Sequence, residues 1–211
     1  MKEARKNSVM QLSELYNVVI GIALSLAIYN TIDGPNTSVS EVFRRLPNFC
    51  VVLFLIIPFY HGAVRHLFAT YVEGGGSSRI KNGALMADFV LLFVEGCVFV
   101  GMATYVDNIL VLAWSVFTLL ILDSIWGFFA WLVFTGAQSQ YAEKKWAMIN
   151  IFTAALILIT LQFEPIYQLN SFNAALILAT VVGIRTVTDY ILTWDFYFPP
   201  EETSETAGSS S

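Results

Sequence analysis

The residues of greatest chemical interest in this sequence are ionisable side chains that interrupt its long apolar runs. If those runs cross a membrane, each charge placed at the bilayer centre costs at least about 2.5–3.5 kcal/mol on insertion scales. Such residues therefore mark an ion or proton pathway, a catalytic site, or polar contacts that hold helices together. The candidate cluster consists of His61, Arg65, His66, Asp88, Glu95, Asp123, Arg185 and Asp189.

Helical spacing places several members of this cluster on shared faces. His61 and Arg65 are four residues apart, and Asp88 and Glu95 are seven apart, so each pair follows one stripe of an α-helix. His61 and His66 are five residues apart and diverge by about 140° around the helix axis. This divergence disfavours a metal ion bound by both histidines, and the usual zinc-ligand spacing is missing. We therefore predict no metal and no cofactor.

The charges of the cluster do not balance. Two arginines face four carboxylates, which leaves two negative charges in excess if both histidines are neutral. Because an uncompensated charge is costly in a low dielectric, a carboxyl group is protonated, a histidine is charged, or a cation is bound. All eight residues fall in the predicted cytoplasmic half of the membrane or near its midplane, which composition alone does not require.

The elements that position these residues are apolar segments. The chain has 211 residues, of which 56% are hydrophobic and 13% charged, whereas soluble domains have about 45–50% and about 25%. We predict an all-α polytopic integral membrane protein with six transmembrane helices in a single domain, 1–198, followed by a disordered acidic and Ser-rich tail, 199–211. The fifth segment is the shortest, and it forms either a helix that spans the membrane or a re-entrant helix. The segments long enough to span, at about 20 residues each, are 15–32, 48–71, 83–105, 109–135, 146–162 and 172–197.

The placement of basic residues predicts the topology. Cytoplasmic loops of membrane proteins carry an excess of Lys and Arg. With the N-terminus inside, the outer segments hold only Arg44 and Arg45, which predicts that both termini are cytoplasmic and suits a bacterial inner membrane. The inner segments then hold Lys2, Arg5, Lys6, Arg79, Lys81, Lys144 and Lys145.

Charge also limits the partners. The net charge is −5, and no basic stripe is present that could follow a phosphate backbone, so nucleic acid is excluded. The expected partners are the lipid bilayer, further copies of the same chain in a homo-oligomer, and a cation at the charged cluster.

The first two segments carry a resemblance to a known family. Residues 15–26 read LYNVVIGIALSL, and the second segment contains FYH at 59–61 and RHLF at 65–68. Over residues 11–72 the chain resembles the transmembrane protein 175 family of potassium-permeable channels, whose first helix opens with Phe-Ser-Asp. Here 15–17 read Leu-Tyr-Asn, and Gln11 stands where the family has arginine, so the polar network of that motif is lost or rebuilt.

The resemblance implies an oligomeric pore lined by the first helix of several subunits. Ile22 and Leu26 would form its hydrophobic constriction, and Ser25 stands where the family often has threonine. A constriction of this kind gates by dewetting.

Three functions remain open on sequence grounds. The first is an oligomeric ion permeation pathway for K⁺ or H⁺. The second is a membrane enzyme acting on a lipid or lipid-linked substrate at the cytoplasmic leaflet, with Arg65 and Arg185 holding a phosphate. No familiar catalytic motif is present, which favours a non-enzymatic role. The third is a membrane sensor or anchor subunit for a partner protein.

Overall fold

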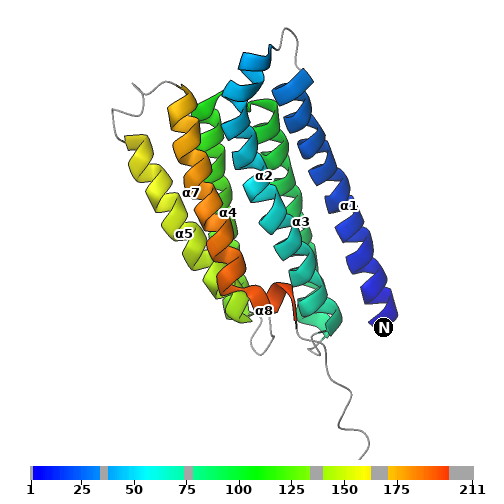
Figure 1. Ribbon diagram of the computed structural model, residues 1–211. Coiled ribbons are helices and arrows are strands. Elements are labelled where there is room, and N and C mark those ends of the chain that lie inside the picture. The colour runs from blue at the N-terminus through cyan, green and yellow to red at the C-terminus, as the bar shows by residue number, and fades with distance from the viewer. Residues whose placement is uncertain (1, 34–37, 74–77, 134–139, 163–170, 200–211) are drawn as a thin grey trace, which may run out of the picture.

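The computed structural model describes residues 2–33, 38–73, 78–133, 140–162 and 171–199, and within these ranges it contains helices and turns but no strand (Figure 1). Two π-helical segments, η1 (Tyr29–Asp33) and η2 (Phe68–Glu73), extend α1 and α2. The helices are α1 (Lys2–Ile28), α2 (Val39–Leu67), α3 (Ser78–Thr104), α4 (Ile109–Val133), α5 (Gln140–Gln162), α7 (Ser171–Leu192) and the short α8 (Trp194–Tyr197).

Six of these helices are long and apolar enough to cross a membrane. The candidate spans run from 21 to 35 residues, and the fifth, Ala142–Gln162, is 21 residues long. A helix rises about 1.5 Å per residue, so 21 residues cover the roughly 30 Å of a bilayer core. The all-α prediction is confirmed over the described residues, and the chain has the architecture of a small multi-pass membrane protein.

Helix ends differ from the predicted segments where polar residues belong to a helix. α1 begins at Lys2 instead of residue 15, because its polar first half still buries Val9 and Ser13 against the bundle. α2 begins at Val39 instead of residue 48, since the Ser38 side chain accepts a hydrogen bond from the Glu41 amide and caps the helix. The last segment was predicted to run unbroken over 172–197.

That last segment divides into two helices. α7 ends at Leu192, and α8 follows after Thr193. The Thr193 hydroxyl donates to the Asp189 carbonyl at 2.6 Å and lies 3.1 Å from the Asp189 carboxylate. Because the break redirects the chain, α8 crosses beneath the bundle in Figure 1 and brings Tyr197 close to Pro58 of α2 and Asp189 of α7.

The helices pack in pairs, α1 against α3, α2 against α7 and α4 against α5. Small residues let these backbones approach closely, as is common in membrane bundles. A Cβ atom added to Gly96 of α3 would lie 2.6 Å from Cγ1 of Val19 in α1. A Cβ atom added to Gly127 of α4 would lie 3.1 Å from the carbonyl oxygen of Glu143 in α5. A side chain at Gly96 would therefore force a shift of its neighbours, and one at Gly127 would press against the backbone of α5.

The interior has an apolar half and a polar half. Since successive helices run in opposite directions, the late residues of α3 and the early residues of α4 share the end away from α8. Phe99, Met102, Leu112 and Leu119 are fully buried there. The buried ionisable residues His66, Asp88 and Asp189 instead belong to the parts of α2, α3 and α7 nearer the end that holds α8 and the N-terminus of α1 (Figure 1).

Candidate functional site

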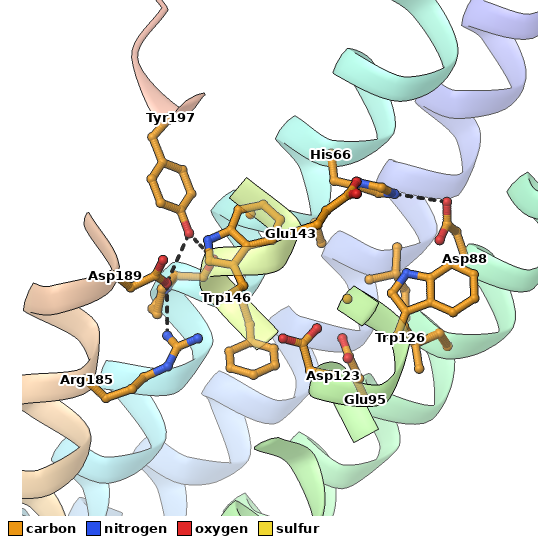
Figure 2. Close-up of a pocket in the computed structure, with 17 residues that line it drawn as sticks. His66, Asp88, Glu95, Asp123, Trp126, Glu143, Trp146, Arg185, Asp189 and Tyr197 are labelled. Carbon is orange, nitrogen blue, oxygen red and sulfur yellow. Dashed lines mark hydrogen bonds and ion pairs between the residues drawn. The ribbon is translucent and has the colours of Figure 1, made fainter. Parts of the chain in front are cut away.

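A cavity of about 60 Å³ lies among α2, α3, α4, α5 and α7 in the polar half. A buried water needs about 10–15 Å³ by this measure, so the cavity has room for about four to six water-sized groups. Aromatic rings of Phe59, Trp126, Trp146 and Tyr197 form part of its wall. Its ionisable lining residues are His66, Asp88, Glu95, Asp123, Glu143, Arg185 and Asp189 (Figure 2).

His66 lies between two carboxylates in the wall of the cavity. Its Nε2 lies 3.2 Å from Oδ2 of Asp88 on α3, and its Nδ1 lies 2.8 Å from Oε1 of Glu143 on α5. The Tyr71 hydroxyl also donates to Oδ2 of Asp88. Both ring nitrogens can donate only in the imidazolium form, so this geometry favours a charged His66 that links α2, α3 and α5.

Glu95 and Asp123 form a carboxyl pair deeper in the bundle. Glu95 lies two helical turns beyond Asp88 on α3, and Asp123 projects from α4, so that their carboxyl groups face each other (Figure 2). Each carboxyl group acts electrostatically on the other. Glu95 is only 2% exposed, while Asp123 is half-buried. Two facing carboxyl groups in a low dielectric can both be ionised only at a high cost, which favours the protonated form of one of them.

Arg185 lies beside this pair but forms its ion pair with Asp189 instead of with Glu95 or Asp123. Its Nε and Nη2 donate to Oδ1 of Asn150 at 3.0 and 2.8 Å, and its Nη1 donates to Oδ2 of Asp189 at 3.1 Å. The amide nitrogen of Asn150 donates in turn to Oδ2 of Asp123 at 2.5 Å. The guanidinium also lies over the Phe59 ring, 5.0 Å from its centroid. Asn150 is therefore the bridge between Arg185 and Asp123.

Tyr197 covers the edge of the cavity from α8. Its hydroxyl donates to Oδ2 of Asp189 at 3.2 Å and lies 3.4 Å from the carbonyl oxygen of Pro58. Burial, and next the negative charge of Asp189, raise the pKa of the Tyr197 phenol well above its ordinary value. The phenol therefore stays protonated at physiological pH and remains a hydrogen-bond donor. Gly62 allows this approach, since a Cβ atom there would lie 3.3 Å from the Tyr197 oxygen.

Negative charge predominates around the cavity. Five carboxyl groups face one guanidinium and one imidazole, so three negative charges would be in excess with all five ionised and His66 protonated. Several of their oxygens are buried and have no hydrogen-bond partner within the described residues, namely Oδ1 of Asp88, Oε1 of Glu95 and Oε2 of Glu143. The cavity is therefore suited to bind protons or another positively charged group.

Six of the eight cluster residues predicted from sequence line this cavity: His66, Asp88, Glu95, Asp123, Arg185 and Asp189. His61 and Arg65 are not among its lining residues. His61 approaches the Tyr190 hydroxyl at 3.2 Å, and Arg65 pairs with Glu73 at 2.6 Å.

Three lining or bridging residues were missed by sequence reasoning. Glu143 belongs to a polar run that we interpreted as a loop, although it lies in the first turns of α5. Asn150 is neutral and was not considered, although it lies seven residues, two helical turns, beyond Glu143. Tyr197 reaches the cavity only because the chain turns at Thr193.

The predicted pore constriction lies on α1, away from the cavity. Ile22 is 49% exposed and Ser25 is exposed on the same face, whereas Leu26 is half-buried and packs against the core. Ile22 and Ser25 would line a pore only if α1 of several subunits came together.

No group of three or more His, Cys, Asp or Glu side chains among the described residues is arranged to hold a metal ion. Comparison with protein-family models, with curated proteins and with solved structures gives no match.

Proposed function

We propose that this multi-pass membrane protein conducts protons, and that Glu95 and Asp123 bind and release them. The main support is that these two carboxyl groups face each other (Figure 2) in a cavity whose lining has more carboxyl groups than basic groups. Both groups cannot be ionised at low cost in a low dielectric, so the pair holds a proton that can be exchanged. Intramembrane carboxyl groups of this kind are typical of proton relays.

A proton suits the cavity better than a bare metal ion. Channel sites for K⁺ surround the ion with a ring of carbonyl oxygens that replaces its hydration shell. Within the described residues no set of carboxylates and histidines converges in this way. The carboxylates are instead spread over four helices and face one another in small groups, which is sufficient for a proton.

His66 connects Glu143 to the part of the cavity that contains the Glu95–Asp123 pair. Its two ring nitrogens lie within 3.2 Å of Glu143 and Asp88. Glu95 lies on the same stripe of α3 as Asp88, and the cavity between them has room for bridging water. We propose that protons move from Glu143 through His66 and Asp88 to Glu95.

The apolar half of the bundle would control passage beyond the pair. Leu55, Phe99 and Leu119 are fully buried above Glu95 and provide no polar group to a proton. Transmembrane flux therefore requires a helix movement or transient water. With the predicted N-in and C-in topology, the polar half faces the cytoplasm of a bacterial inner membrane.

A second candidate is an oligomeric cation channel with α1 at its axis. Ile22 and Ser25 are exposed on one face of α1, and nothing lies within 4 Å of a Cβ atom added to Gly21. The resemblance of residues 11–72 to the transmembrane protein 175 family supports this arrangement. In such a channel the cavity would regulate or stabilise each subunit.

The test is a proton flux assay with purified protein in liposomes that contain a pH-sensitive dye. An imposed K⁺ gradient and valinomycin provide the driving voltage. We expect the wild-type protein to acidify the lumen and Glu95→Gln to reduce the rate at least tenfold, because the amide cannot release a proton. Glu14→Gln is the matched control, since Glu14 is exposed on α1 and does not line the cavity.

The two candidates give different results in this assay. If wild-type liposomes conduct K⁺ without valinomycin and Ile22→Asn changes that current, the α1 pore is supported and the proton proposal is wrong. If Glu95→Gln conducts protons like the wild type, the carboxyl pair is not the proton site.

A further inference from the structure

The unpartnered polar atoms of the cavity are mostly acceptors. Oδ1 of Asp88, Oε1 of Glu95 and Oε2 of Glu143 have no hydrogen-bond partner among the described residues. The three side chains are at most 2% exposed, and all three line the cavity. The matching unpartnered donor in the wall is Nε1 of Trp146. A ligand rich in N–H donors would satisfy this wall, and an anion would not.

The protein already holds one cation of this kind in the same wall. The guanidinium of Arg185 is bound by the carboxylate of Asp189, the amide oxygen of Asn150 and the face of the Phe59 ring. A carboxylate combined with an aromatic face is a common way to bind a nitrogen cation. The same combination is present again around the cavity and is not used by Arg185.

That second set consists of Glu95, Asp88 and the indole rings of Trp126 and Trp146. Both indoles line the cavity together with the two carboxylates (Figure 2). Trp is the aromatic residue with the strongest attraction for cations. Phe59 is occupied by Arg185, so the indoles provide the remaining aromatic surface.

The volume limits the size of the ligand. At about 10–15 Å³ per water-sized group, a cavity of about 60 Å³ holds about four to six such groups. Guanidinium has four heavy atoms and methylammonium has two, so both fit with space left for water. A water beside the ligand can accept the hydrogen bond from Nε1 of Trp146.

We propose that the cavity binds one small N–H-bearing cation of the guanidinium or primary ammonium class. The cation is bound by Glu95 and Asp88 against the indoles of Trp126 and Trp146. Binding displaces the proton shared by Glu95 and Asp123 into solvent, so one positive charge enters as one leaves. This exchange rests on the proposed function, because it uses the same carboxyl pair.

Other ionisable groups nearby set the conditions for the exchange. Asp88, Asp189 and Arg185 act electrostatically on the pair, and Tyr16 of α1 faces Glu95. His66 remains bound between Asp88 and Glu143. Because Oδ1 of Asp88 takes no part in these contacts, it can accept a hydrogen bond from the ligand. Oδ2 of Asp88 meanwhile keeps its contacts with His66 and Tyr71.

The experiment measures binding to the purified full-length protein in detergent at constant ionic strength. Guanidinium chloride and methylammonium chloride are titrated to about 20 mM at pH 7, with tetramethylammonium and potassium chloride as comparison salts. Calorimetry reports binding, and a pH indicator in weak buffer reports released protons. We expect saturable binding of the two N–H cations with proton release, and at least tenfold weaker binding of tetramethylammonium and K⁺.

Variants separate this site from nonspecific binding. Glu95→Gln should weaken binding at least tenfold and abolish proton release, and Trp126→Leu should weaken binding without removing the release. Glu14→Gln should bind like the wild type. Equal binding of K⁺, or unchanged binding by both Glu95→Gln and Trp126→Leu, would overturn the cation site.

The binding experiment and the flux experiment can each give a negative result without the other. Proton flux in liposomes without any added nitrogen cation, together with no binding in detergent, would retain the proposed function and reject the cation site. Saturable binding with proton release but no flux would retain the site and reject proton conduction.

Discussion

Asn150 is the residue through which the charges of the cavity are connected. Its side-chain oxygen accepts two hydrogen bonds from Arg185, and its nitrogen donates one to Asp123. Since the amide is neutral, it separates the guanidinium from the carboxyl group without adding charge. A direct ion pair between Arg185 and Asp123 would favour the ionised carboxylate more strongly than the neutral amide of Asn150 does.

The first prediction concerns Asn150→Leu, which conserves approximate volume and removes all three hydrogen bonds. Hydrogen bonds to charged groups contribute about 1.5–3 kcal/mol each, so we expect the free energy of unfolding to fall by at least about 3 kcal/mol. For a chain of this size this corresponds to a decrease in Tm of about 6–12 °C. Thermal unfolding in detergent measures the change.

Asn17→Leu is the control, because Asn17 is exposed on α1. The same substitution there should change Tm by less than about 2 °C, since exposed substitutions usually alter stability by no more than about 0.5 kcal/mol. Equal effects of the two substitutions would show that Asn150 has no special part in the charge network.

At the scale of single residues, the sequence predicted most of the ionisable side chains that line the cavity. Six residues of the predicted cluster converge because charges within apolar helices must turn inward. Arg65 does not follow this rule. It lies near the end of α2, where its guanidinium donates hydrogen bonds to the Glu73 carboxylate and the Phe196 carbonyl. Glu143 was missed because its neighbours Lys144 and Lys145 made the segment read as a polar loop. Spacing alone does not reveal the end of a helix.

At the scale of elements, α2 contains a proline that another helix compensates. Pro58 lacks an N–H group, so the carbonyl of Phe54, four residues earlier, loses its helical partner. The Thr186 hydroxyl of α7 donates to that carbonyl at 2.5 Å. The gap in the helix is therefore filled across the contact between α2 and α7.

The second prediction is a double-mutant cycle on this contact. Thr186→Val should destabilise the protein by about 1–2 kcal/mol, because it leaves the Phe54 carbonyl unsatisfied in lipid. In a Pro58→Ala background the restored N–H bonds the same carbonyl, and Thr186→Val should then cost less than about 0.5 kcal/mol. Additive effects of the two substitutions on unfolding would contradict this account.

The third prediction compares two glycines on α3. Gly96→Ala forces a methyl group against Val19 of α1, where the Cβ–Cγ1 distance would be 2.6 Å. We expect a loss of about 1–3 kcal/mol, typical of overpacking. At Gly101 nothing lies within 4 Å of an added Cβ atom, so Gly101→Ala should stabilise the helix by up to about 1 kcal/mol. Chemical unfolding of both variants measures the difference.

Element boundaries were less predictable than element number. Composition and run length predicted six apolar helices, because about 20 apolar residues are needed to span a bilayer. The break at Thr193 could not be predicted, since residues 190–197 contain no glycine or proline. It depends on the hydrogen bonds between Thr193 and Asp189, which exist only in the folded chain.

At the scale of the whole molecule, the two ends of the bundle differ chemically. The end with α8 holds the charged cavity, and the other end is stabilised by surface ion pairs. Arg45 pairs there with Asp107 at 2.9 Å and donates to the Asn30 carbonyl at 2.7 Å. The cavity thus lies closer to one end of the bundle than to the other. The orientation of the protein in a membrane decides which side that end faces.

The last prediction tests that orientation with single cysteines in a Cys50→Ala, Cys97→Ala background. Tyr105 lies in the turn between α3 and α4 and is 57% exposed, whereas Ser8 is exposed near the N-terminus of α1. If both termini are cytoplasmic, a membrane-impermeant maleimide should label Tyr105→Cys in intact cells. Ser8→Cys should be labelled only in inverted vesicles. The opposite pattern would place the cavity at the outer surface, and labelling of both from one side would contradict an odd number of spans between residues 8 and 105.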